Sequence, residues 1–160
     1  MSAPTIRRVL VANRGEIALR IIRACHDEGL EAVAVYSDAD RTAPFVRAAD
    51  AAVHIGPSPA AQSYLLIDKL IEAARSTGAG AIHPGFGFLA ERAAFAQAVE
   101  DAGLVFVGPP ASAIAAMGSK TEARRRMEAA GVPVVPGAMA AISDPAQAAT
   151  LAESLGYPVL

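Results

Sequence analysis

The sequence has no tryptophan, few aromatic residues, a single cysteine and no long hydrophobic run. One cysteine, Cys25, excludes an intrachain disulfide and a multi-cysteine metal site, and it suits a reducing compartment. No apolar run approaches the roughly 18 residues of a membrane span, and no apolar segment follows the N-terminal arginines as it would in a secretory signal. We therefore expect a cytoplasmic protein.

The charge is also nearly balanced, because the formal net charge is −2. This value argues against nucleic acid or an anionic membrane as a bulk electrostatic partner. Hydrophobic residues make up 53% of the 160 positions, so the chain has ample material for a core. With few aromatics, that core must consist mainly of Ala, Val, Ile and Leu, which is typical of parallel sheets covered by helices.

Short apolar runs alternate with helical patterns along the first two thirds of the chain. The runs predict buried strands, and the intervening patterns repeat apolar residues at helical spacing. This alternation predicts βαβ units, right-handed crossovers and a doubly wound, mostly parallel α/β sheet of Rossmann-like type. The expected strands are 8–12, 32–36, 52–55, 79–83 and 104–107, and the expected helices are 17–25, 65–76 and 92–102, with a weaker helical turn at 44–49.

The Gly108-Pro-Pro110 sequence marks the end of this first unit, so we expect domains at 1–110 and 111–160. In the second, Ser119 and Glu122 have capping-box spacing, and Asp144 precedes a proline as a helix N-cap would. Because the sequence ends within an apolar strand pattern, we expect a fragment of a longer chain. The expected elements are helices at 111–117, 119–130 and 144–156, and strands at 132–136 and from Tyr157 to the end.

The stretch 81–91 joins a strand to a helix through Pro84, Gly85 and Gly87. The glycines allow positive φ, and the proline favours an extended His83. Ligands bind at the carboxyl ends of parallel strands, so Phe86 is a candidate binding residue. The alternative is a tight turn whose two phenylalanines fill the core.

Several common sites are not predicted. The first βα turn, residues 12–18, has one glycine and lacks the G-x-G-x-x-G fingerprint, so we do not expect NAD or FAD. The histidines His26, His54 and His83 lack metal-ligand spacing, and no nucleophile elbow is present. We expect no metal ligand and no catalytic residue in this segment.

Two charged features each have two interpretations. Lys120 falls in the first turn of its helix, where a cation opposes the helix dipole, so it is either part of a phosphate site or a surface lysine. Residues 124–126 are arginines spread around the same helix, and we expect them to be solvated. Glu16, Arg20, Arg23 and Asp27 share one helix face, which is either solvated or a self-complementary dimer surface.

Five motifs in order resemble the start of biotin carboxylase, and together they cover essentially the whole chain. They are Val11-Ala-Asn-Arg-Gly-Glu-Ile-Ala18, His83-Pro-Gly-Phe-Gly-Phe-Leu-Ala-Glu91, Val107-Gly-Pro109, Met117-Gly-Ser-Lys120 and Val132-Pro-Val-Val-Pro-Gly137.

The resemblance implies the N-terminal part of an ATP-grasp ligase that uses MgATP and bicarbonate to carboxylate biotin on a carrier protein, for a partner carboxyltransferase. Residues 1–110 would form the pre-ATP-grasp domain, and 111–160 would begin the ATP-grasp domain. The family's lid, magnesium ligands, bicarbonate ligands and catalytic arginine lie further along, so we expect these 160 residues to be inactive alone. The alternative function is that of a short non-catalytic paralogue acting as a dimerisation or binding module.

The resemblance also assigns roles to residues. Lys120 matches an ATP-binding lysine, and Phe86 with Gly87 matches part of the biotin pocket. Arg20, Arg23 and Asp27 resemble a homodimer contact. This sequence departs from the family at Phe86, where tyrosine is usual, and at Arg92, where asparagine is usual.

Overall fold

The computed structural model describes residues 6–137 and 142–159. The chain divides into two compact units, Met1–Ile114 and Ala115–Leu160, and we describe each by itself. The expected domain boundary after residue 110 stays a prediction.

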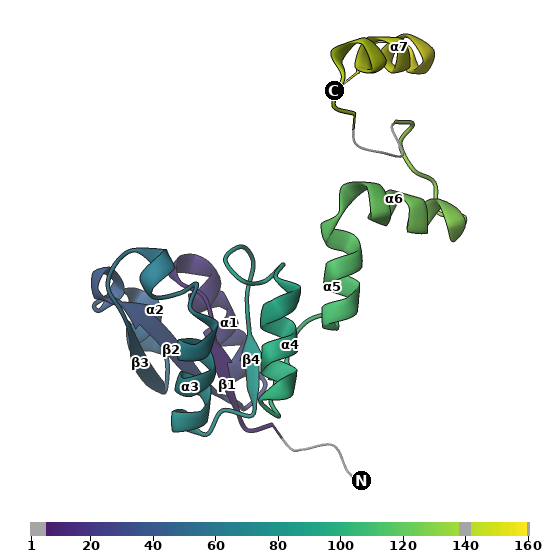
Figure 1. Ribbon diagram of the computed structural model, residues 1–160. Coiled ribbons are helices and arrows are strands. Elements are labelled where there is room, and N and C mark those ends of the chain that lie inside the picture. The colour runs from purple at the N-terminus through teal and green to yellow at the C-terminus, as the bar shows by residue number, and fades with distance from the viewer. Residues whose placement is uncertain (1–5, 138–141, 160) are drawn as a thin grey trace. The chain divides into compact units, whose positions relative to one another are not determined.

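The first unit is built on a five-stranded parallel sheet (Figure 1). The strands lie in the order β3-β2-β1-β4-β5, so the chain runs outward from β1 to β3 and then returns to the other side of β1. This order confirms the predicted doubly wound α/β sheet and puts its switch point between β1 and β4. The strands are β1 (Arg8–Val11), β2 (Glu31–Ser37), β3 (Ala51–Gly56), β4 (Ala81–His83) and β5 (Val105–Phe106).

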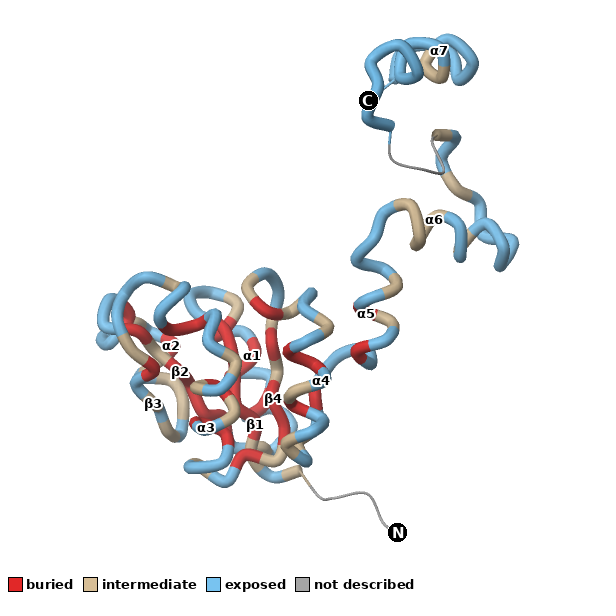
Figure 2. The backbone as a smooth tube through the Cα atoms, in the orientation of Figure 1, coloured by how far each residue is buried: buried red, intermediate tan, exposed pale blue. Residues whose placement is uncertain are grey.

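Helices cover both faces of the sheet. Alternate strand residues face opposite sides, so Leu10 packs with one buried cluster and Val9 with the other. Figure 2 shows the buried residues concentrated along the strands and the facing sides of the helices. Helices α3 (Ile67–Thr77) and α4 (Ala93–Asp101) contribute to the first cluster, and α1 (Gly15–Asp27) and α2 (Pro44–Ala48) to the second. Short 3-10 turns occur at η1 (Asp38–Asp40) and η2 (Ala60–Gln62).

The second unit is helical over its described residues. It contains α6 (Lys120–Ala129) and α7 (Pro145–Leu155), and α5 (Ala111–Gly118) spans the division between the units. The predicted N-caps are present, since Ser119 Oγ accepts from the Glu122 amide at 3.4 Å and Asp144 Oδ1 from the Ala146 amide at 3.0 Å. The capping box is one-sided, because the Glu122 carboxylate pairs with arginines of its own helix instead.

Two strand predictions in this unit are wrong. Neither residues 132–136 nor residues 157–159 form a strand, and Leu160 lies outside the described residues. A strand needs a hydrogen-bonded neighbour, and the described part of this unit offers none. Pro133 and Pro136 also remove backbone donors from the first segment. Among the described residues, no helix is both long enough and apolar enough to cross a membrane.

Candidate functional site

The loop after β4 presents Phe86 at the carboxyl edge of the sheet. Gly85 and Gly87 have φ of +67° and +66°, as their positions in the turn predict. Phe88 is a non-glycine residue with positive φ, at +46°. Phe86 is 63% exposed, whereas the Phe88 ring stacks on Tyr64 with centroids 5.3 Å apart. Each interpretation therefore fits one of the two phenylalanines. Phe88 packs against the core, as a core-filling residue would, and Phe86 faces solvent, as a binding residue would.

Asn13, two residues after the end of β1, holds this loop through hydrogen bonds. Its buried carboxamide donates to the carbonyls of Pro84 at 2.8 Å and Phe86 at 2.9 Å, and its Oδ1 accepts from the Arg14 amide at 2.9 Å. A β-carbon on Gly85 would lie only 2.8 Å from Asn13 Nδ2. Asn13 thus joins the chain after β1 to the loop after β4, at the switch point of the sheet.

A charged cluster lies beside the loop and is centred on Asp40. Arg14 donates to both carboxylate oxygens of Asp40, from Nε at 2.7 Å and from a terminal nitrogen at 2.6 Å. Tyr64 Oη donates to the same carboxylate at 2.7 Å, and Ser37 Oγ donates at 3.2 Å. Tyr64 Oη also accepts from the Ser37 amide at 3.1 Å, so every polar group of the cluster has a partner.

The protonation states of this edge follow from these contacts. The hydrogen bonds from Arg14 lower the pKa of Asp40, so its carboxylate is charged at neutral pH. Burial, together with the bond to Asp40, raises the pKa of Tyr64 to about 12, so this phenol remains a donor. Burial lowers the pKa of His83, whose Nδ1 accepts from the Gly85 amide at 3.1 Å. A neutral His83 therefore carries its proton on Nε2.

The sequence pointed to Phe86 and Gly87 as candidate ligand-binding residues but not to the groups that hold their loop. Asn13 lies 71 residues from Pro84, and Asp40 lies 24 residues from Tyr64. No periodicity or short motif links positions so far apart. The only local signal for Asn13 was its polar side chain in the first βα turn, because a polar side chain that is buried there must find a hydrogen-bond partner.

Lys120 occupies the first position of α6, directly after the N-cap Ser119, and its side chain is exposed. Arg125 and Arg126, by contrast, pair with Glu122, and that pairing lowers the pKa of the carboxyl group. Arg92 is the N-cap residue of α4 and makes no side-chain capping bond. An asparagine at this position would be a better N-cap.

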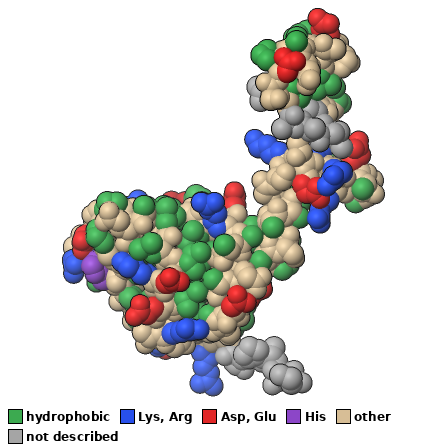
Figure 3. Space-filling model, viewed as in Figure 1, with side chains coloured by type: hydrophobic (Ala, Val, Ile, Leu, Met, Phe, Trp, Pro, Cys, Tyr) green, Lys and Arg blue, Asp and Glu red, His purple; other side chains and the backbone are tan. Residues whose placement is uncertain are grey.

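The charged stripe of α1 consists of Glu16, Arg20, Arg23 and Asp27, all exposed. Arg20 also lines an apolar groove of about 530 Å³ together with Ile17 and Ile21 of the same helix. Figure 3 views the first unit from the side of α3 and α4, opposite to α1, and basic and acidic side chains are interspersed on that face too. A surface with both signs beside an apolar groove fits either a solvated face or a self-complementary contact.

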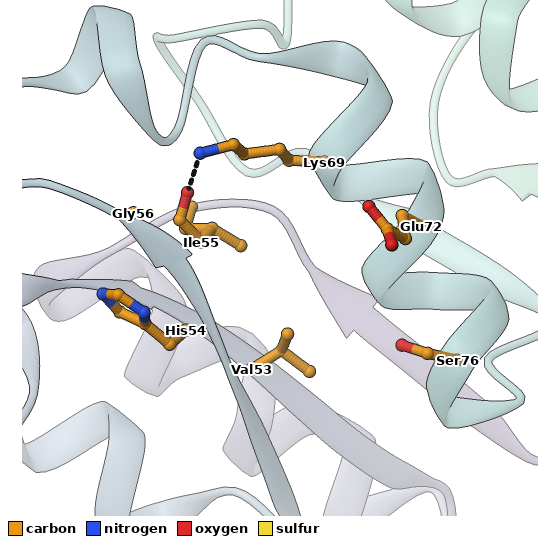
Figure 4. Close-up of a pocket in the computed structure, with 7 residues that line it drawn as sticks. All are labelled: Val53, His54, Ile55, Gly56, Lys69, Glu72 and Ser76. Carbon is orange, nitrogen blue, oxygen red and sulfur yellow. Dashed lines mark hydrogen bonds between the residues drawn. The ribbon is translucent and has the colours of Figure 1, made fainter.

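A second hollow, of about 330 Å³, lies between β3 and α3 and is lined in part by Lys69, Glu72 and Ser76 (Figure 4). The Lys69 ammonium already donates to the carbonyl oxygens of Ile55 at 2.8 Å and Gln62 at 3.2 Å. It therefore serves to fasten the end of β3. We assign the functional site to the Phe86 loop instead.

The family profile described as "Biotin carboxylase, N-terminal domain" matches residues 5–114, and "Carbamoyl-phosphate synthase L chain, ATP binding domain" matches residues 119–160. Biotin carboxylase 1 of Bacillus subtilis is 52% identical over 155 residues, which are 97% of this chain and 34% of that protein. Biotin carboxylase of Pseudomonas aeruginosa is 53% identical over 156 residues, which are 97% of this chain and 35% of that protein.

Solved structures agree with the sequence relatives. Biotin carboxylase from Campylobacter jejuni, in a β-γ-ATP complex, superposes with a TM-score of 0.90 at 42% identity, covering 96% of this chain and 34% of that one. The biotin carboxylase domain dimer of Hydrogenobacter thermophilus 2-oxoglutarate carboxylase, with MgADP, ADP and bicarbonate, gives 0.89 at 44% identity, covering 98% and 34%.

The fold and the matches define an α/β N-terminal domain followed by the start of an ATP-binding domain. The chain belongs to the biotin carboxylase family, which confirms the resemblance drawn from its motifs. It spans about a third of the length of these relatives.

Proposed function

We propose that this chain is the N-terminal part of an ATP-dependent biotin carboxylase. The longer protein would form carboxyphosphate from MgATP and bicarbonate and then carboxylate biotin held on a carrier protein. The observation that carries the proposal is the 52% identity to a biotin carboxylase over 97% of this chain, together with an N-terminal-domain profile at residues 5–114 and an ATP-binding-domain profile at residues 119–160. The ligands of magnesium and bicarbonate would come from residues beyond this segment.

Phe86 and Gly87 would contact biotin. Phe86 is the exposed aromatic residue of the loop, and a ring of this kind offers an apolar face to the bicyclic ligand. A β-carbon at Gly87 would meet no atom within 4 Å, so a ligand could approach the backbone there. Compared with the family's usual tyrosine, Phe86 lacks one hydroxyl for orienting the ligand.

Lys120 would bind a phosphate group of ATP. Ser119 caps only one of the free N–H groups in the first turn of α6, and the remaining ones suit an anion. A cation in that turn is unfavourable next to the helix dipole unless an anion also binds. The ATP phosphates would supply that anion.

The proposed partners are a biotinylated carrier, a carboxyltransferase and a second copy of the same protein. The second copy would meet Arg20, Arg23 and Asp27 of α1, which are all exposed. We place the protein in the cytoplasm because its single cysteine suits a reducing compartment.

The test of the function uses the longer protein that contains this segment. We expect ATP hydrolysis that depends on both bicarbonate and free biotin, and none from the 160-residue chain alone. Measuring phosphate release gives the rate of ATP hydrolysis for both the longer protein and the 160-residue chain. If the longer protein hydrolyses no ATP under these conditions, the non-catalytic dimerisation or binding module becomes the better explanation.

The same assay tests the phosphate ligand. Lys120→Gln should raise the KM for ATP about tenfold, since one charge-assisted hydrogen bond contributes roughly 1.5–3 kcal/mol. Arg126→Gln is the matched control, because Arg126 lies on the same helix but pairs with Glu122. An ATP KM within about twofold of wild type for Lys120→Gln would leave this residue as a surface lysine.

The dimer contact is tested separately. Arg20→Glu should weaken self-association of the longer protein, because it changes the sign of one charge in a self-complementary surface. Sedimentation velocity over a dilution series measures the effect. Arg75→Glu on α3, an exposed position on the opposite side of the sheet, is the control. Equal sedimentation of the two variants would favour the solvated-face interpretation.

A further inference from the structure

Asn13 is a short, buried side chain whose two N–H donors both act on a single loop. Both of its N–H donors are used, on the carbonyls of Pro84 and Phe86, which flank Gly85. Its oxygen accepts from the Arg14 amide, which fixes the plane of the carboxamide. A serine offers one donor and an aspartate none, so only a short amide supplies both donors from this position.

The loop needs these hydrogen bonds because the Phe86 side chain makes little packing contact of its own. Its side chain is 63% exposed, and neither core cluster of the described residues includes it. Packing therefore does not set the direction of the ring. The backbone on either side of Gly85 sets it, and that backbone is held by the two bonds from Asn13.

The far end of the loop is held by the next residue along the chain. Arg14 binds the Asp40 carboxylate, which accepts from Tyr64 Oη, and the Tyr64 ring stacks on Phe88. Two consecutive residues in the turn after β1 thus restrain both sides of Phe86. Asn13 acts directly and Arg14 acts through a chain of contacts.

We propose that Asn13 is a positioning residue that fixes the 84–88 loop in the shape that presents Phe86 to biotin. The proposal rests on the function proposed above. Asn13 is buried and acts on the loop through its backbone carbonyls, so its loss should weaken biotin binding while leaving the ATP site unchanged.

The experiment uses the longer protein with free biotin as the probe. Asn13→Ala should raise the KM for biotin about tenfold, equivalent to 1.4 kcal/mol, with the ATP KM within twofold of wild type. Hydrogen–deuterium exchange should become faster in residues 83–90 and stay unchanged in β1 and β2. Ser63→Ala is the control, because Ser63 is also buried but donates to the Pro59 carbonyl outside this loop. This variant should leave both KM values and the loop exchange unchanged.

The possible outcomes distinguish failure of the Asn13 positioning role from failure of the proposed carboxylase function. A biotin KM within twofold of wild type in Asn13→Ala, or unchanged loop exchange, would overturn the positioning role while leaving the carboxylase function in place. A parallel rise of both KM values with faster exchange throughout the sheet would also overturn it, because that pattern indicates general loss of the fold. A wild-type protein without biotin-dependent activity would overturn the proposed function, and the biotin-positioning role with it.

Discussion

Asp40→Ala should lower the free energy of unfolding of the 160-residue chain by about 2–4 kcal/mol. The carboxylate is buried and accepts from Arg14, Tyr64 and Ser37. Its removal leaves the phenol of the buried Tyr64 without an acceptor. Arg14 is partly solvated, with 47% of its side chain exposed, so we expect less than the full cost of leaving a buried charge unpaired.

Asp38→Ala is the matched control. Asp38 lies two positions earlier and pairs with Arg41 and His54, but about half of its side chain is exposed. Exposed pairs contribute only roughly 0–1 kcal/mol. Equilibrium urea unfolding of both variants gives the comparison from the shift in midpoint at constant slope. Equal costs for the two aspartates would show that the Asp40 cluster contributes no more than a surface pair.

The same cluster predicts a dependence of stability on pH. The bonds from Arg14 lower the folded-state pKa of Asp40 below its ordinary value of 3.8. The folded state then binds fewer protons than the unfolded state in this range, so the contribution is present above pH 3.8 and is lost as the pH falls through the folded pKa. Asp40→Asn should therefore reduce the acid sensitivity of the unfolding midpoint.

Much of the first unit could be predicted because its signals are local. Each strand is a short apolar run ended by turn residues, and each helix carries an apolar stripe, so the α/β class and the positions of the elements follow from spacing. The positive φ of Gly85 and Gly87 was also predictable, since it depends on residue type and turn position. The strand predicted at 132–136 was wrong because a strand depends on a neighbour that a local pattern does not reveal.

The support of the site depends on contacts distant in sequence. Phe88 has a positive φ although it is not glycine, and its ring stacks on Tyr64. Tyr64 is itself fixed by Asp40, and no pattern in the sequence connects these positions. Phe86, the exposed aromatic residue of the loop, could be found from the motif that contains it. The residues that hold the loop could be found only from the structure.

Gly85→Ala should lower the free energy of unfolding by about 3 kcal/mol, and Gly87→Ala by about 1 kcal/mol. Both glycines have nearly the same φ, +67° and +66°, so the strain of placing alanine in this region is shared. They differ in their surroundings. A β-carbon at Gly85 would lie 2.8 Å from Asn13 Nδ2, whereas one at Gly87 would meet nothing within 4 Å. The difference between the two free energies of unfolding thus measures the cost of displacing the Asn13 amide from the carbonyls of Pro84 and Phe86.

A double-mutant cycle separates this displacement from backbone strain. In the Asn13→Ala background the amide is already absent and only the β-carbon of residue 13, at 3.2 Å, remains close, so Gly85→Ala should cost only about 1 kcal/mol. The coupling between Asn13 and Gly85 would then be about 2 kcal/mol, which is large for one side chain and one backbone position. Urea unfolding of the single and double variants measures all the terms. Strictly additive costs would show that Gly85 is required for its φ alone, and that the close approach of Asn13 adds nothing to the stability of the loop.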